Sequence, residues 1–214
     1  MDILEKYLKL DNLNLFIFIT IIVTVQLYVQ QEYVFMPQMN DIPLFNGALK
    51  SQLIDQFVKY RWLSFIIAPL ILFLRITIVG YCLFVGGILF DSWKSLNYRS
   101  CFNVALKADI ILVSFSIVYT FLVVIFGYEK GLYLMNCFSL IAFFDMNTTE
   151  PWLLAPLALF NLFELLYWIF LAKLLSKELN NKYFISLSFV ISTYGVGFVL
   201  YILFVVFILL FVYQ

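Results

Sequence analysis

The 214-residue sequence contains no histidine, and this absence removes several kinds of active site. Ser-His and Cys-His hydrolases, His-Glu-x-x-His zinc enzymes and bis-histidine haem proteins all need an imidazole group. The three cysteines are widely spaced, with no Cys-x-x-Cys, which favours neither a disulfide framework nor a thiolate metal site. We therefore predict a non-enzymatic protein without a metal or another cofactor.

Charged residues are also scarce. They make up 12% of the chain, with 13 basic and 13 acidic side chains that balance to a net charge of zero. Soluble domains carry about 25% charged residues. The balance and the lack of a basic cluster exclude nucleic acid as a partner. Hydrophobic residues make up 64%, more than a soluble core of this size can hide, so we predict an integral membrane protein in contact with the lipid bilayer.

Five stretches are long and apolar enough to cross a bilayer, whose hydrocarbon core of about 30 Å needs about 20 helical residues. The predicted spans are residues 13–29, 62–90, 108–128, 152–172 and 183–213. The expected fold is all-α. It is a single membrane domain over residues 1–214, built as a bundle of five transmembrane helices with amphipathic or interfacial helices in the outer loops. The first span lacks a small-residue cleavage site and is expected to stay as a signal anchor.

The basic residues between these spans predict the orientation of the chain. Four lie on the side opposite the N-terminus: Lys50, Lys59, Arg61 and Lys130. Eight lie on the N-terminal side: Lys6, Lys9, Lys94, Arg99, Lys107, Lys173, Lys177 and Lys182. The positive-inside rule therefore predicts a multi-pass protein with a cytoplasmic N-terminus and an extracytoplasmic or lumenal C-terminus.

Two outer connections are expected to form helices of their own. Residues 47–60 place apolar side chains on one helical face and charged ones opposite. They either lie in the interface plane before the second span or form a short helix that caps the bundle. Residues 132–144 are apolar but too few to cross, so a re-entrant or interfacial segment is predicted there.

Arg75 and Glu164 are the charges predicted deep within spans. Arg75 follows Trp62 by 13 residues, Glu164 follows Trp152 by 12, and both spans enter from the outer side. At about 1.5 Å per residue the two charges lie about 18–20 Å deep, so they are expected to pair. Asn161 precedes Glu164 by one turn and extends this polar set. The pair either locks the second helix to the fourth or belongs to an ion or proton pathway.

Two weaker patterns accompany the pair. On the third span Asp109, Ser116 and Thr120 share one helical face. Glycines give the fifth span a small-residue face for close helix contact, and the pair Gly86-Gly87 either does the same on the second span or loosens its inner end. These glycines of the fifth span are Gly195 and Gly197.

The second half of the chain resembles the Yip (Ypt/Rab-interacting protein) superfamily. The resemblance rests on Pro156, the run Asn161-Leu162-Phe163, the aromatic pair Tyr167-Trp168, a basic turn over 173–182 and a last span from Tyr183. It covers residues 60–214, although glycines common in the family's cytoplasmic turn are absent. The resemblance implies five spans and a non-enzymatic membrane protein that organises membranes or binds other proteins.

Two functions remain open at this point. The first is a membrane-organising, accessory or scaffold subunit, Yip-like, that binds another membrane protein or forms a homo-oligomer. The second is a small transporter or channel subunit that uses Arg75, Glu164 and Asn161. An intramembrane enzyme is disfavoured, because Asp109 and Asp145, the acids available for a catalytic dyad, are predicted at opposite faces of the membrane.

Overall fold

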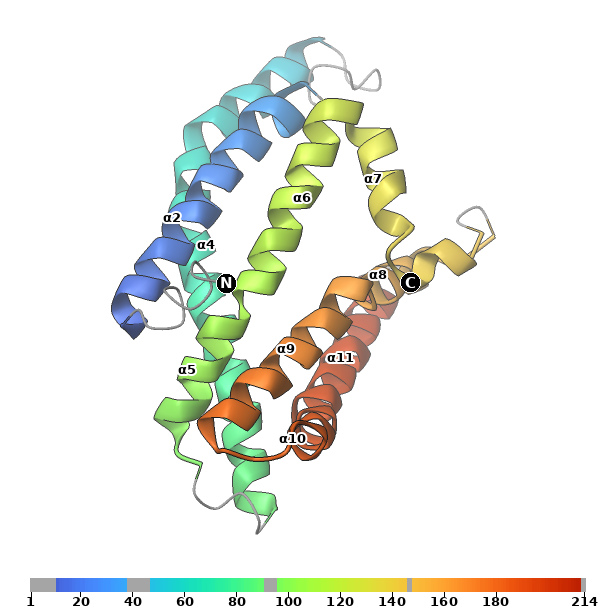
Figure 1. Ribbon diagram of the computed structural model, residues 1–214. Coiled ribbons are helices and arrows are strands. Elements are labelled where there is room, and N and C mark those ends of the chain that lie inside the picture. Colours follow the sequence, from blue (N-terminus) through green and yellow to red (C-terminus); the bar gives the residue numbers. More distant parts are fainter. Residues whose placement is uncertain (1–10, 38–46, 91–95, 146–147, 213–214) are drawn as a thin grey trace.

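The computed structural model describes residues 11–37, 47–90, 96–145 and 148–212, and the regular elements in these ranges are helices (Figure 1). Helix α2 (Asn12–Gln30) continues through a π-helical turn, η1 (Gln31–Phe35). Helix α4 (Gly47–Leu89) is 43 residues long and includes Pro69. In the view of Figure 1, α2 rises along the bundle and α4 descends to its lower end.

The middle of the chain rises again as two helices in line. Helix α5 (Tyr98–Ala108) begins at Asn97, whose side chain accepts a hydrogen bond from the backbone N–H of Ser100 at 2.8 Å. Helix α6 (Ile110–Phe126) follows directly and ends at Gly127, where φ is +81°, a conformation that favours glycine. The chain then folds back through α7 (Tyr128–Asn136) and the 3₁₀ turn η3 (Leu140–Phe143).

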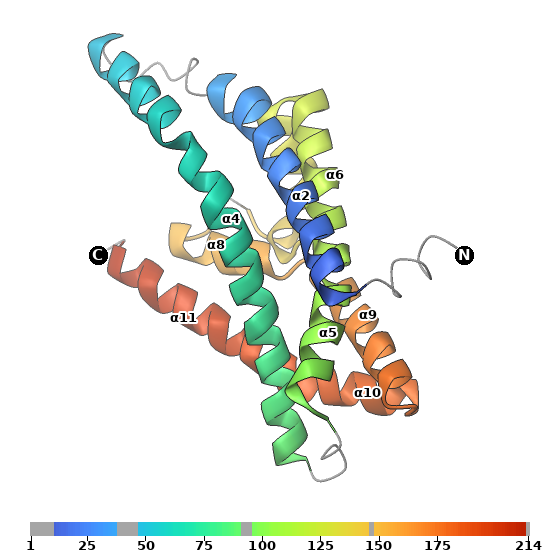
Figure 2. The same cartoon turned by 90° about the vertical axis from the view of Figure 1, so that its left-hand side faces the viewer.

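The last third of the chain runs down the bundle through two helices separated by a break, and then up again through a final helical segment. Helices α8 (Pro151–Leu159) and α9 (Leu162–Glu178) are separated by an extended pair of residues. Helix α10 (Tyr183–Val190), the π-helical turn η4 (Ile191–Gly195) and α11 (Val196–Val212) form one continuous rod. Figure 2 shows this rod leaving the lower end of the bundle at a steep tilt to α4.

In the described ranges, four helices are long and apolar enough to cross a membrane: Asn12–Phe35, Ile54–Leu89, Tyr98–Phe126 and Tyr183–Phe211. They correspond to the first, second, third and fifth predicted spans, and they support a multi-pass membrane protein. The predicted fourth span, 152–172, is not one continuous helix, because the chain is extended at Phe160 and Asn161. Five crossings therefore remain a prediction.

The outer loop helices also differ from expectation. Residues 47–60 do not form a separate interfacial helix, since they continue without a turn into the apolar part of α4. The backbone between Gly47 and Trp62 contains no proline to end the helix. Residues 132–144 form the end of α7 and all of η3, which are too short to cross a membrane, as the sequence predicted. Their depth in a bilayer stays a prediction.

The apolar core lies at the lower end of the bundle, where α4, α5, α9 and α10 meet. Its most enclosed side chains include Leu83 of α4, Cys101 of α5 and Leu171 of α9, each with no exposed surface. Large apolar side chains on the outer faces of α4, α6 and α11 are widely exposed, as expected of helices that contact lipid. Three basic residues used to predict orientation, Lys6, Lys9 and Lys94, fall outside the described ranges.

Candidate functional site: a charged cluster between the helices

The centre of the molecule contains an ion pair between Arg75 of α4 and Asp109 at the junction of α5 and α6. A guanidinium N–H of Arg75 donates to Oδ1 of Asp109. The Asp109 side chain is 1% exposed, whereas that of Arg75 is 41% exposed. The carboxylate of the pair is therefore enclosed by protein, whereas the Arg75 side chain is partly exposed.

Glu164 lies in the first turn of α9 and binds groups from two helices. Its Oε1 accepts a hydrogen bond from the indole N–H of Trp168 at 2.7 Å and another from the hydroxyl of Tyr194 at 2.8 Å. Tyr194 belongs to η4, so Glu164 ties α9 to the final rod. The residue is buried, and both contacts stabilise its carboxylate form.

The structure pairs Arg75 with Asp109, and it shows Glu164 with Trp168 and Tyr194 rather than in the predicted hydrogen bond with Arg75. Arg75 and Glu164 still lie close enough for electrostatic interaction, and Tyr167 of α9 lies within the same range. The equal depth of Arg75 and Glu164 in a bilayer stays a prediction, and the sequence missed Asp109 as the partner of Arg75 because Asp109 was placed at the inner end of a span. It lies instead at the junction of α5 and α6, within the candidate membrane-spanning stretch Tyr98–Phe126.

Asn161 has a structural position that the sequence did not anticipate. Its side-chain oxygen accepts from the backbone N–H of Glu164 at 2.9 Å, which makes Asn161 the N-cap of α9. Its amide nitrogen donates to the carbonyl oxygens of Ala158 and Leu159 at 3.3 and 3.2 Å. Asn161 therefore satisfies backbone groups on both sides of the break and orients Glu164 through the helix that it begins.

The break before α9 is stabilised by the segment that follows α7. Asn161 and Ser139 form an antiparallel bridge. The backbone N–H of Leu140 donates to the carbonyl of Phe160 at 2.9 Å, and that of Leu162 donates to the carbonyl of Phe138 at 2.8 Å. Irregular backbone is tolerated inside a membrane protein only when its polar groups are satisfied by protein or water. The bridge meets that condition and lets α9 begin beside the cluster.

Glycines bring the final rod close to α4 and α9. A Cβ built on Gly86 would lie 2.0 Å from Cγ2 of Thr193, and one on Gly197 would lie 3.0 Å from Sγ of Cys82. A Cβ on Gly195 would lie 3.1 Å from the Trp168 ring. The predicted close contacts at these glycines are confirmed, and they place Tyr194 within reach of Glu164.

A second polar contact joins α2 to α6. Gln26 donates to the hydroxyl of Thr120 at 3.1 Å and also to Ser116, while Gln30 donates to Thr120 at 2.7 Å. The shared face of Ser116 and Thr120 was predicted from the sequence, but the glutamines that bind it were not. Two glutamines one turn apart at the outer end of an otherwise apolar span were the available signal.

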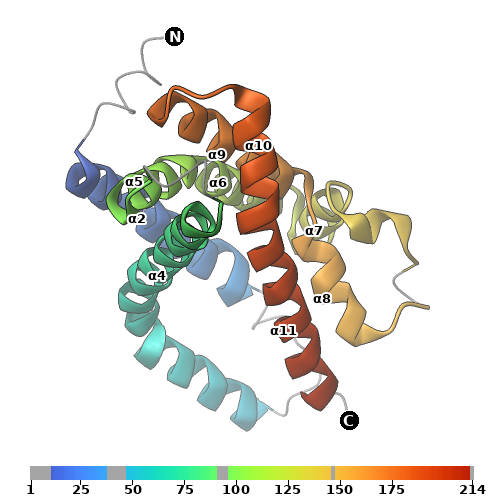
Figure 3. The ribbon, with the colours of Figure 1, turned by 90° about the horizontal axis from the view of Figure 1, so that it is seen from below.

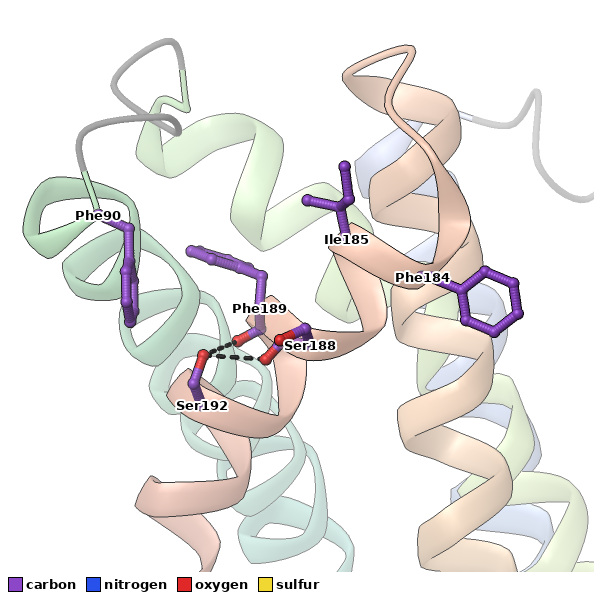
Figure 4. Close-up of a pocket in the computed structure, with 6 residues that line it drawn as sticks. All are labelled: Phe90, Phe184, Ile185, Ser188, Phe189 and Ser192. Carbon is purple, nitrogen blue, oxygen red and sulfur yellow. Dashed lines mark hydrogen bonds between the residues drawn. The ribbon is translucent and has the colours of Figure 1, made fainter.

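The structure also has an apolar pocket of about 350 Å³ at the lower end, between the end of α4 and the rod of α10 and η4 (Figure 4). The Ser192 hydroxyl donates its proton to carbonyl oxygens of its own helix, at Ser188 and Phe189, so it can offer a ligand only an acceptor oxygen. The pocket is lined by Phe90, Phe184, Ile185, Ser188, Phe189 and Ser192.

The chemistry available to the cluster is electrostatic and acid–base. Two carboxyl groups and one guanidinium lie among phenol and indole donors. In the part of the chain that the structure describes, no group of three or more Cys, Asp or Glu side chains could hold a metal ion. No protein-family model, no curated protein and no solved structure matches this chain.

Proposed function

We propose that this chain is a non-enzymatic, Yip-like membrane protein that acts as an accessory or membrane-organising subunit by binding another membrane protein through α11. The observation that carries the proposal is how little of α11 packs within the chain. Its first turns contact α4 and α9 through Gly197 and Phe198, and α8 lies along one side. Figures 2 and 3 show the rest of the helix running away from the bundle.

The exposed part of α11 presents a continuous stripe of large apolar side chains. The stripe recurs at steps of three and four residues, which places its members on one helical face. Phe207 and Phe211 pack edge to face within it, with ring centroids 5.0 Å apart. The stripe consists of Leu200, Leu203, Phe204, Phe207 and Phe211, which are 57% to 69% exposed.

A lipid tail or a partner helix can cover such a face, and its geometry favours the helix. Lipid tails are as apolar as leucine, so apolarity alone does not bring membrane helices together. A regular stripe at helical spacing provides ridges that pack against a second helix. The charged groups of the cluster contact one another or aromatic side chains of this chain, which agrees with a protein that works through its outer surface.

The test is photo-crosslinking in native membranes with a photoreactive residue at Phe204, in the middle of the stripe. The matched control is Ile71 of α4, which has the same exposure, 60%, on a different helix. The proposal predicts a defined protein adduct from position 204 and only lipid adducts from position 71. An adduct of twice the chain mass identifies a second copy as the partner. Lipid adducts alone at both positions would overturn the proposal.

A transporter or channel subunit is the second candidate, and one observation favours it. Transporter sites often lie where a broken helix begins within the membrane. Here α9 begins beside the Arg75–Asp109 pair and carries Glu164 in its first turn. Ion flux into vesicles that contain wild-type protein or Glu164→Gln tests this candidate. Ion flux that is present with wild-type protein and lost with the variant favours transport. A flux with wild-type protein equal to that of protein-free vesicles rejects transport.

A further inference from the structure

The charged cluster contains more acid than base. Two carboxyl groups, on Asp109 and Glu164, face one guanidinium, on Arg75. The other titratable groups in range are Tyr167 of α9 and Tyr194 of η4, both neutral as phenols, and Cys82 of α4, which lies in range of Tyr167. With both carboxyl groups ionised the cluster would carry one uncompensated negative charge. Such a charge inside a membrane bundle costs several kcal/mol.

Asp109 has an oxygen atom to which no group among the described residues donates a hydrogen bond. Its Oδ1 accepts from Arg75, but its Oδ2 is fully buried and has no hydrogen-bond partner. More than about 90% of buried polar atoms in proteins are paired, so such an atom calls for an explanation. Glu164 differs, because its Oε1 already accepts hydrogen bonds from two donors. Oδ2 of Asp109 is therefore the open acceptor of the cluster.

A metal ion does not fit this position. Hard cations such as Ca²⁺ need about six to eight oxygen ligands, and the described residues contain no group of three acidic or thiol side chains that could supply them. A proton needs a single oxygen lone pair and restores neutrality on its own. We propose that Asp109 and Glu164 bind one exchangeable proton between them, with Oδ2 of Asp109 as its acceptor.

The partly exposed Arg75 side chain marks the side from which we expect the proton to enter. Asp109 is closed off at 1% exposure, but the adjoining Arg75 side chain is 41% exposed. The proposed path for the proton runs along the Arg75 side chain to the carboxyl group and back, with water as donor and acceptor, and only O–H bonds form or break. Because the carboxyl groups share one guanidinium, they titrate as a coupled pair rather than as independent acids.

Loss of the proton affects the packing of α9. Asp109 lies at the junction of α5 and α6, both of which contact α9, and Glu164 lies in the first turn of α9. With the proton removed, the two carboxylates repel each other across these contacts. The site thus couples the protonation of the cluster to the position of the broken helix. This inference requires neither of the two functions considered above.

Infrared difference spectroscopy on the purified protein in lipid nanodiscs tests the proposal through the C=O stretch of a protonated carboxyl group. Wild type is expected to show a carboxylic-acid band at neutral pH that disappears on alkaline titration. Asp109→Asn and Glu164→Gln should each abolish it, because either change leaves one carboxylate to balance Arg75. Arg75→Gln should increase it about twofold, because two carboxyl groups then need protons. Asp145→Asn, on an exposed turn, is the control and should leave the band unchanged.

The wild-type spectrum alone tests the proposed proton site, even if a variant fails to fold. Absence of the band in folded wild-type protein at neutral pH would overturn the proposal. Persistence of the band in both folded variants, Asp109→Asn and Glu164→Gln, would place the proton elsewhere and overturn it as well.

Discussion

Replacing Arg75 by methionine should destabilise the fold far more than a comparable change on the same helix. The guanidinium is the only group that serves the carboxylate of Asp109 within the described residues. Breaking a buried pair on one side costs about 3 to 5 kcal/mol, because the other charge is left without a counter-charge. We expect Arg75→Met to lower the free energy of unfolding by this amount at alkaline pH. The cost should fall at acidic pH, because a protonated Asp109 needs no counter-charge.

Replacing the other partner of the pair, Asp109, should lower the free energy of unfolding by less. Asp109→Leu leaves an arginine whose side chain is 41% exposed and which remains within electrostatic range of Glu164. The leucine also fills the buried position with an apolar group. The double variant Arg75→Met with Asp109→Leu should therefore be close to Asp109→Leu alone, so the coupling energy should equal the cost of Arg75→Met, about 3 to 5 kcal/mol.

Arg61 provides the matched control on α4. It pairs with Glu32 at 2.6 Å, but the two side chains are 35% and 32% exposed. Such exposed pairs contribute about 0 to 1 kcal/mol, so Arg61→Met should have little effect. Reversible unfolding in mixed micelles, followed by tryptophan fluorescence, measures all four variants. The reasoning is refuted if Arg75→Met costs no more than Arg61→Met, or if the two changes of the double variant are additive.

Three further changes test other contacts by the same unfolding assay. Gly86→Ala should cost about 1 to 3 kcal/mol by overpacking against Thr193, and adding Thr193→Ala should recover part of the loss; equal stability of Gly86→Ala and wild type would contradict the close contact. Asn161→Ala should lower the free energy of unfolding by about 1 kcal/mol, because the cap of α9 is lost. Asn161→Ser should retain most of the stability, because serine can also cap a helix. Gln26→Leu should cost about 0.6 to 1.7 kcal/mol, and no loss would show that the contact with α6 contributes little.

Hydropathy located the long helices because each is apolar over a continuous stretch. Helices α2 and α6 begin and end close to the predicted limits of the first and third spans. The same criterion could not detect the break at Phe160 and Asn161. That break depends on backbone bonds to Phe138 and Leu140, which are distant in sequence and become neighbours only after folding. A capping asparagine within an apolar run was the one local sign of it.

The candidate site was predicted in part. Arg75 and Glu164 were identified because charges are rare within spans, and both belong to the cluster. Asp109 was misplaced because the stretch before it looked like a polar loop. In fact α5 has a polar side and a buried side, the latter including Cys101, Val104 and Ala108, and it carries Asp109 into the interior. The donors Trp168 and Tyr194 were not predicted, because aromatic side chains are common throughout the spans.

The uninterrupted length of α4 has a mechanical consequence. Its 43 residues extend over about 64 Å at about 1.5 Å per residue, roughly twice the hydrocarbon thickness of a bilayer. The part of α4 that precedes Arg75 is therefore a long arm. Pro69 weakens α4 by removing a backbone hydrogen bond one to two turns before the ion pair. A tilt of about 5° at that point displaces the far end by roughly 3 Å. A force applied at the Gly47 end of α4 would therefore bend the helix first at Pro69, and only the remaining movement would reach the charged cluster.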